Sequence, residues 1–156
     1  MDKQAAVEAF WQAYLASLPA GAERPEEPYE IGYFADNEQD ADELGELVRA
    51  GTKTATCGSL WWYEAENEAP PKVGDLFLVT NWAGDPLCIV ETTEVQVRPF
   101  NEVDAQFAYD EGEGDRSLAY WRRVHVAFFT RELAEIGREP SESMPLVCER
   151  FRKVFP

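Results

Sequence analysis

Gly51-Thr52-Lys53-Thr54-Ala55-Thr56 is the stretch that decides the fold. Residues 38–50 before it carry an apolar stripe at helical spacing, so we predict a helix there that Gly51 ends as a C-terminal cap. Residues 54–59 are typical of a strand. Lys53 therefore stands between a helix and a strand, beside threonine hydroxyls. An ammonium there can bind an anion or, if desolvated, act as a base.

The elements on either side of this stretch follow from hydrophobic periodicity and from glycine and proline positions. The order of elements predicts an α+β fold with a small mixed β-barrel and surrounding helices. The 156 residues suggest a single domain, in which residues 1–28 form an N-terminal helix and connector and residues 29–155 form the barrel. We predict helices over residues 2–18, 38–50 and 117–136, strands over 29–34, 54–59, 75–82, 86–97 and 145–155, helical turns within 101–109 and an acidic loop over 110–115.

Charge and composition exclude several classes of function. Lys and Arg total 14 against 30 Asp and Glu, a formal net charge of -16, which repels polyanions and argues against sequence-blind binding to duplex DNA. No apolar run reaches the ~20 residues of a membrane span, and the N-terminus lacks the form of a signal peptide. We therefore expect a cytoplasmic protein that binds no membrane.

Cysteine and histidine usage argues against a metal or redox centre. Cys57, Cys88 and Cys148 are widely spaced and odd in number, which favours reduced thiols in the core. The one histidine, His125, falls on the apolar stripe of the last predicted helix, so we expect a packed residue rather than a ligand. Residues 110–115 hold four carboxylates but lack calcium-loop spacing. We expect no metal and no cofactor.

The motifs, taken in order, resemble those of ASCH-domain proteins, which are relatives of PUA domains. The resemblance is to a longer bacterial subgroup described as predicted RNA-binding proteins, and it covers roughly residues 29–155. It rests on Gly51, Lys53 and Thr56 in a Gly-x-Lys-x-x-Thr pattern, on Lys72-Val73-Gly74-Asp75, on Arg98-Pro99-Phe100-Asn101-Glu102-Val103, on Glu111-Gly112-Glu113-Gly114-Asp115, and on Leu118-Ala119-Tyr120-Trp121 before the last strand.

The resemblance implies a small β-barrel with helices around a cleft, and RNA or nucleosides as ligands. Some members hydrolyse the amide of N4-acetylcytidine with the motif lysine, the motif threonine and a later glutamate. Carried over, these catalytic residues are Lys53, Thr56 and Glu113, with Glu111 or Asp115 as alternative counterparts of the glutamate.

From these residues we expect a protein that recognises a cytidine-like base of a nucleoside or short single-stranded RNA and hydrolyses N4-acetylcytidine. A ribonuclease acting on single-stranded RNA and a non-catalytic RNA-binding module are the alternatives. In the hydrolase, a neutral Lys53 would take the proton of the nucleophile. Residues 53 and 56 would point to opposite faces of a regular strand, so both can line one pocket only if the chain turns between them.

Further candidates for substrate binding surround this centre. Aromatic side chains after the motif can stack on unstacked bases, although core packing is their common role. The predicted substrate-binding residues are Thr54, Trp61, Trp62, Asp75, Arg98, Arg116 and Ser117.

Overall fold

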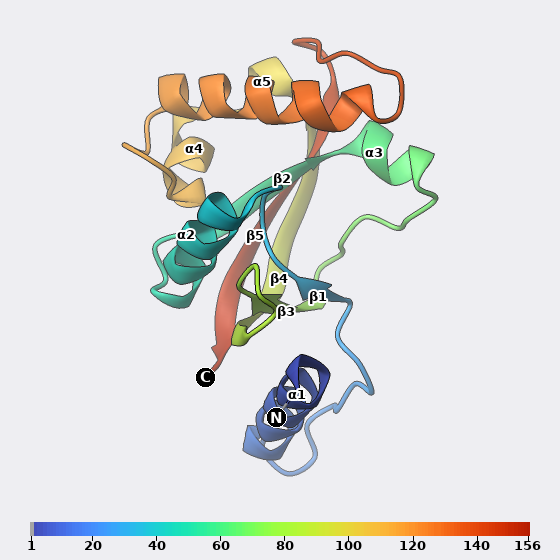
Figure 1. The fold of residues 1–156 in the computed structure, drawn as a ribbon, viewed down its shortest axis with the longest axis vertical. Helices are drawn as coiled ribbons and strands as arrows, with labels where there is room; N and C mark the ends of the chain where they lie inside the picture. The colour runs from blue at the N-terminus through green and yellow to red at the C-terminus, as the bar shows by residue number, and fades with distance from the viewer. Residues whose placement is uncertain (1) are drawn as a thin grey trace.

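The computed structural model describes residues 2–156 and places one mixed sheet between helices (Figure 1). None of the helices in these residues is long and apolar enough to cross a membrane. The helices are α1 (Lys3–Ser17), α2 (Glu38–Arg49), α3 (Leu60–Ala65), the short 3₁₀ helix η1 (Phe100–Glu102), α4 (Ala105–Glu111) and α5 (Leu118–Ala134), and the strands are β1 (Glu30–Gly32), β2 (Ala55–Ser59), β3 (Leu76–Thr80), β4 (Pro86–Pro99) and β5 (Pro145–Phe155).

The five strands form one sheet in the order β1-β3-β4-β5-β2. β1 pairs with β3 in parallel, and all other neighbours are antiparallel. β4 and β5 are the long strands, and their pairing shifts register twice, between Ile89 and Val90 and between Thr92 and Glu94. Such irregularities bend a sheet, and Figure 1 shows the curved sheet with helices around it. The predicted α+β class with a PUA-like mixed barrel is confirmed.

Two helices bury opposite ends of the sheet (Figure 1). The stripe of α5, including Trp121, Phe129 and Leu133, packs with η1 and α4 in one core cluster. At the other end, Trp11 and Tyr14 of α1 pack on β3 and β4 in a second cluster. The N-terminal helix therefore covers one end of the sheet, far from α5.

The predicted boundaries differ from the structure in two places. Residues 60–65 form helix α3, which the aromatic-rich sequence of this segment did not predict. The acidic stretch does not begin as a loop, because α4 continues through Glu111 and ends at Gly112 with left-handed φ of 75°. Asp104 caps the start of α4 by accepting a hydrogen bond from the Phe107 amide, and Gly112 ends the helix two residues beyond the predicted turns.

Candidate functional site

Lys53 lies at the centre of a buried charge cluster. Its side chain is 1% exposed. Its Nζ donates to Glu111 Oε1 at 2.9 Å, to Glu113 Oε2 at 3.3 Å and to the carbonyl oxygen of Ala55 at 2.8 Å. The ring of Phe34 lies 5.4 Å from the same nitrogen. A buried ammonium with two carboxylate partners is held in one position by the charges around it.

Glu111, at the end of α4, contacts Lys53 and two residues of α5. Its Oε2 accepts a hydrogen bond from Trp121 Nε1 at 2.6 Å and lies 3.4 Å from His125 Nε2. His125 Nδ1 lies 2.8 Å from the carbonyl oxygen of Trp121, which can only accept, so this nitrogen carries a proton. Two aromatic residues of α5 thereby orient the carboxylate that faces Lys53.

Gly112 explains why the sequence alternates glutamate and glycine here. A Cβ at this position would lie 2.8 Å from the carbonyl oxygen of Thr52 and 3.1 Å from Lys53 Cα. Its φ of 75° is also strained for a residue with a side chain. Glycine therefore lets the chain pass close to Lys53, so that the residues on both sides, Glu111 and Glu113, reach the same ammonium.

The charges shift the acid–base behaviour of all three groups. Burial lowers the pKa of Lys53, but the attraction of Glu111 and Glu113 outweighs burial and leaves this pKa raised. Burial raises the pKa of Glu111, but Lys53 and His125 bring it down to about 2. Burial outweighs Lys53 at Glu113, whose pKa is raised. Lys53 is therefore an ammonium and Glu111 a carboxylate at neutral pH, and the neutral lysine expected from the sequence is not what this arrangement favours.

A small cavity of about 90 Å³ opens on this cluster. Lys53, Thr56 and Glu113 all line it, together with Glu111 and His125. Because Lys53 precedes β2, which begins at Ala55, the strand alternation that would separate positions 53 and 56 does not apply. The fold therefore brings together at one cavity the three side chains that the sequence predicted as catalytic.

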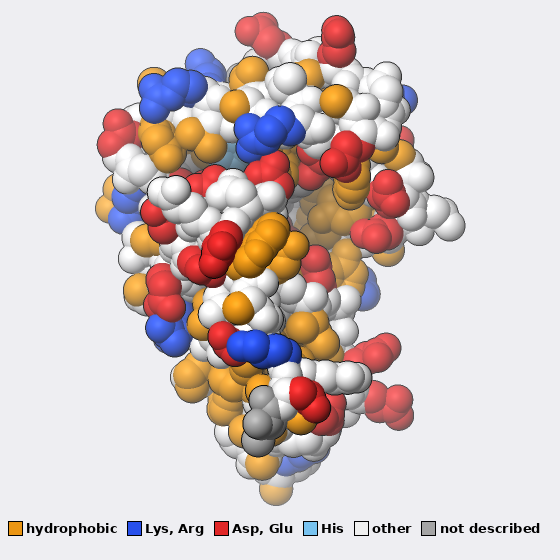
Figure 2. Space-filling view, in the orientation of Figure 1, with side chains coloured by type: hydrophobic (Ala, Val, Ile, Leu, Met, Phe, Trp, Pro, Cys, Tyr) orange, Lys and Arg blue, Asp and Glu red, His pale blue; other side chains and the backbone are white. Residues whose placement is uncertain are grey.

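The small cavity adjoins a larger cleft of about 580 Å³. Phe34, Thr56, Cys57 and Phe128 line both, so the two spaces share a wall. Figure 2 shows a hollow below α5 with hydrophobic side chains inside and acidic side chains around its rim. The volume of the cleft is that of sites for small organic molecules.

Comparison with known proteins shows the family of this chain. The family model described as the ASCH domain matches residues 30–155. This chain belongs to the ASCH-domain family. The crystal structure of an ASCH domain from Lactobacillus crispatus JV V101 is similar, with 39% identity, a TM-score of 0.92 and coverage of 97% of this chain and 96% of that chain. A protein of Enterococcus faecalis V583 is similar at 36% identity and a TM-score of 0.86, covering 97% and 90%. A search among curated proteins gives no match.

The other predicted residues of this ASCH domain divide between the cleft and the rest of the surface. Trp62 and Asp75 line the large cleft, and Asp75 also pairs with Lys72 at 2.8 Å. Trp61 instead packs against the core beneath the Arg138 guanidinium, 4.5 Å from its ring. These placements separate two adjacent tryptophans that the sequence could not distinguish.

Four predicted residues line neither space. Thr54 anchors the motif, since its amide donates to the carbonyl oxygen of Asp110 at 2.8 Å. Arg116 stacks 3.6 Å from the Tyr109 ring, Arg98 donates to Gln96, and Ser117 caps α5. The contacts of these four side chains and backbones are with other parts of the fold, and not with either cavity.

The structure also sorts the three acidic candidates of the sequence. Glu111 is buried and fully engaged. Glu113, with a side chain 16% exposed, faces the small cavity. Asp115 is exposed and accepts a hydrogen bond from the Ser117 amide at the start of α5. Glu113 is the carboxylate best placed to meet a ligand.

Two functional candidates were missed or undervalued in the sequence. Glu149 lines the large cleft, and it stands in β5 on the same face as Val147 and Phe151. An acidic residue among apolar residues of one face was the signal for it. His125 was expected as a packed residue, and it does stack on Trp121, with centroids 4.2 Å apart, while also facing Glu111.

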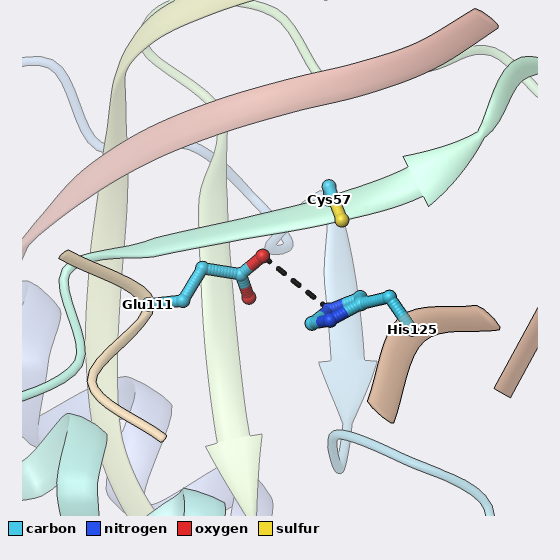
Figure 3. A group of neighbouring side chains, drawn as sticks. All are labelled: Cys57, Glu111 and His125. Atoms are coloured by element: carbon cyan, nitrogen blue, oxygen red, sulfur yellow. Dashed lines mark ion pairs between the residues drawn. The ribbon is translucent and has the colours of Figure 1, made fainter. Parts of the chain in front are cut away.

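Cys57, Glu111 and His125 come close enough to suggest a metal site. One ligand atom from each lies within 4.8 Å of the others, and they converge from β2, α4 and α5 (Figure 3). However, Glu111 already accepts from Lys53 and Trp121, and the buried ammonium supplies positive charge next to this position. Burial and the charge of Glu111 also raise the pKa of the Cys57 thiol well above its usual value. We assign the group to holding Lys53 rather than to metal binding.

Proposed function

We propose that this ASCH-domain protein binds a cytidine-like base in the large cleft and hydrolyses an exocyclic acyl amide, with N4-acetylcytidine as the best candidate substrate. The observation that carries the proposal is the shared lining of the two spaces. Thr56 stands in both, beside the aromatic cleft and beside Lys53 and Glu113. A base in the cleft would thus direct its exocyclic amide at the small cavity.

The charges suggest how the residues divide the work. Glu113 combines a raised pKa with access to the cavity, which suits a group that takes and returns a proton. Lys53 remains an ammonium, which suits stabilising a developing oxyanion rather than acting as a base. Glu111 holds the ammonium in place without taking part in proton transfer.

The proposed reaction has two steps. Glu113 takes the proton of Thr56 Oγ, which bonds to the acetyl carbonyl carbon while the carbonyl oxygen becomes negative beside Lys53. Glu113 then gives the proton to the exocyclic nitrogen, the carbon–nitrogen bond breaks, and cytidine leaves. A water then loses a proton to Glu113 as its oxygen bonds to the acetyl carbon. The bond from that carbon to Thr56 Oγ breaks, Glu113 returns the proton to Thr56 Oγ, and acetate leaves.

The lining of the cleft does not favour ribonuclease activity. Among residues 2–156, no lysine or arginine lines the large cleft. Phosphate recognition depends on such cations. A binding module remains the alternative, and the proposed experiment distinguishes it.

The test is to incubate the purified protein with N4-acetylcytidine and to follow cytidine and acetate by chromatography. We expect turnover by the wild type, a loss of at least ~100-fold in Glu113→Gln, and near-complete loss in Thr56→Val with partial activity in Thr56→Ser. Asp115→Asn, in the same acidic stretch but exposed, is the matched control and keeps wild-type turnover.

Two outcomes would overturn the proposal. Absence of turnover by folded wild-type protein, with N4-acetylcytidine still bound, would leave a binding module. Equal turnover in Glu113→Gln and the wild type would remove the proton-transfer role. An oligoribonucleotide in a parallel incubation is expected to stay intact.

A further inference from the structure

The large cleft carries charge of one sign only. Five carboxylates line it, and within residues 2–156 no cationic side chain does. Lys72 pairs with one of them, Asp75, from outside the lining. Aromatic residues supply much of the remaining wall, including Tyr29, Tyr33 and Trp62. The five carboxylates are those of Glu30, Glu68, Asp75, Glu132 and Glu149.

Glu149 connects the acidic lining with the small cavity. It is the direct partner of Thr56 in the antiparallel β2–β5 ladder, so the two side chains stand next to each other on one face of the sheet. The only hydrogen bond of the Glu149 carboxylate within residues 2–156 comes from Thr92 Oγ1, which donates to Oε1 at 3.0 Å. One carboxylate oxygen thus remains for a ligand placed beside Thr56.

We infer that the large cleft selects a flat heterocycle that is positively charged or becomes so during the reaction, and that it rejects phosphate. Glu149 accepts a hydrogen bond from the N–H groups at the edge of this heterocycle. Aromatic walls with carboxylates attract a cation through both ring faces and charge. A phosphate in the same place would meet like charges with no cation to offset them. The ligand class is therefore a nucleoside or a related organic cation and not a nucleotide.

This inference rests on the proposed function in placing the base in the cleft, and it adds a reason for the lining. When the exocyclic nitrogen accepts its proton before the carbon–nitrogen bond breaks, the base is transiently a cation. The carboxylate beside Thr56 stabilises that species more than the neutral substrate, which is the difference that accelerates a step.

The test measures binding at neutral pH by calorimetry with three matched probes: 3-methylcytidine, whose ring is cationic at this pH, cytidine, and 3-methylcytidine 5′-monophosphate. We expect 3-methylcytidine to bind ~10-fold more tightly than cytidine and the monophosphate to bind ~10-fold more weakly than 3-methylcytidine. Glu149→Gln should weaken binding of the charged nucleoside more than that of cytidine, so that the preference falls at least ~3-fold. Glu102→Gln, an exposed change outside both cavities, is the control.

The outcomes separate this inference from the proposed reaction. Equal affinity for cytidine and 3-methylcytidine, or tighter binding of the monophosphate, overturns the charge selection even if N4-acetylcytidine is hydrolysed. Charge preference that persists in Glu149→Gln overturns the role of that residue. A clear preference for the cation in a protein without amidase activity would keep the cleft assignment and remove only the reaction.

Discussion

The buried cluster and the large cleft hold carboxylates under opposite conditions. Glu111 is surrounded by Lys53, Trp121 and His125, and its pKa falls to about 2. Burial raises the pKa of Glu149 and of Glu132 to about 7, and among residues 2–156 no cation shares the cleft lining with them. The carboxylates of the cluster are paired with a cation, whereas Glu149 and Glu132 are not paired with one in the described part of the chain. Unpaired, partly buried carboxylates with shifted pKa values are typical of ligand-binding sites.

The largest effect should follow from breaking the cluster. Glu111→Gln leaves the ammonium of Lys53 buried with the weaker partner Glu113, so we expect a loss of about 3–5 kcal/mol in the free energy of unfolding, measured with urea. Asp115→Asn, an exposed change in the same stretch, should change the free energy of unfolding far less.

A double variant sharpens this test. Lys53→Met with Glu111→Gln removes both charges of the pair, so the double variant should lose clearly less stability than the sum of the two single variants. Additive losses would mean that the two groups do not depend on each other, contrary to the geometry.

The next effect concerns the close approach that builds the cluster. Gly112→Ala introduces both a strained φ and a contact at 2.8 Å with the backbone of Thr52, so we expect a loss of about 2–4 kcal/mol. Gly21 has a φ of 86° with nothing within 4 Å of an added Cβ, so Gly21→Ala carries the strain alone and should cost about 1 kcal/mol. Equal losses at the two positions would show that the approach of α4 to Lys53 is not tight.

The sequence predicted the cluster better than the cleft. The helix, Gly51 and the strand that follows fixed where Lys53 stands, and the spacing of Glu111, Gly112 and Glu113 is local enough to be recognised. Burial of a lysine could not be predicted from its neighbours in the chain, because its partners come from residues 58 and 60 positions away. For the same reason the sign of its pKa shift was missed.

The cleft depends on pairings that are not local. Glu149 stands beside Thr56 only because β2 and β5 pair in one register, and a slip by one residue would turn it to the other face. Trp61 and Trp62 differ in role because α3, which the sequence did not predict, turns them in different directions. Arg98 and Arg116 drew attention by charge, yet each finds partners close to it in the chain.

The pH dependence of stability should have opposite signs in the two regions. The pKa of Glu111 is lowered, so its contribution is present above its unfolded pKa and is lost as the pH falls from about 4.5 toward 2. The pKa of Glu149 is raised, so the folded state binds its proton more tightly, and stability is lost as the pH rises from about 4.5 through 7. The charges of Glu30 and Asp75 raise the pKa of Glu149 further, whereas the hydrogen bond from Thr92 and the charge of Lys53 lower it.

Glu149→Gln tests the sign in the cleft. The amide removes the charge that burial penalises and can still accept the bond from Thr92, so we expect a gain of about 1–2 kcal/mol at pH 8 and little change at pH 4.5, measured by thermal unfolding. Glu102→Gln should show no such difference between the two pH values. If Glu149→Gln raises stability equally at pH 8 and pH 4.5, the effect comes from packing and not from ionisation of Glu149.

The smallest effect compares a buried hydroxyl without a partner with one that caps a helix. Ser59 Oγ lacks a partner within residues 2–156, so Ser59→Ala should leave the free energy of unfolding unchanged or raise it by less than about 1 kcal/mol. Ser117 caps α5 by accepting from the Tyr120 amide at 3.1 Å, so Ser117→Ala should cost about 1 kcal/mol. If Ser59→Ala costs as much as Ser117→Ala, the Ser59 hydroxyl already has a partner in the folded chain.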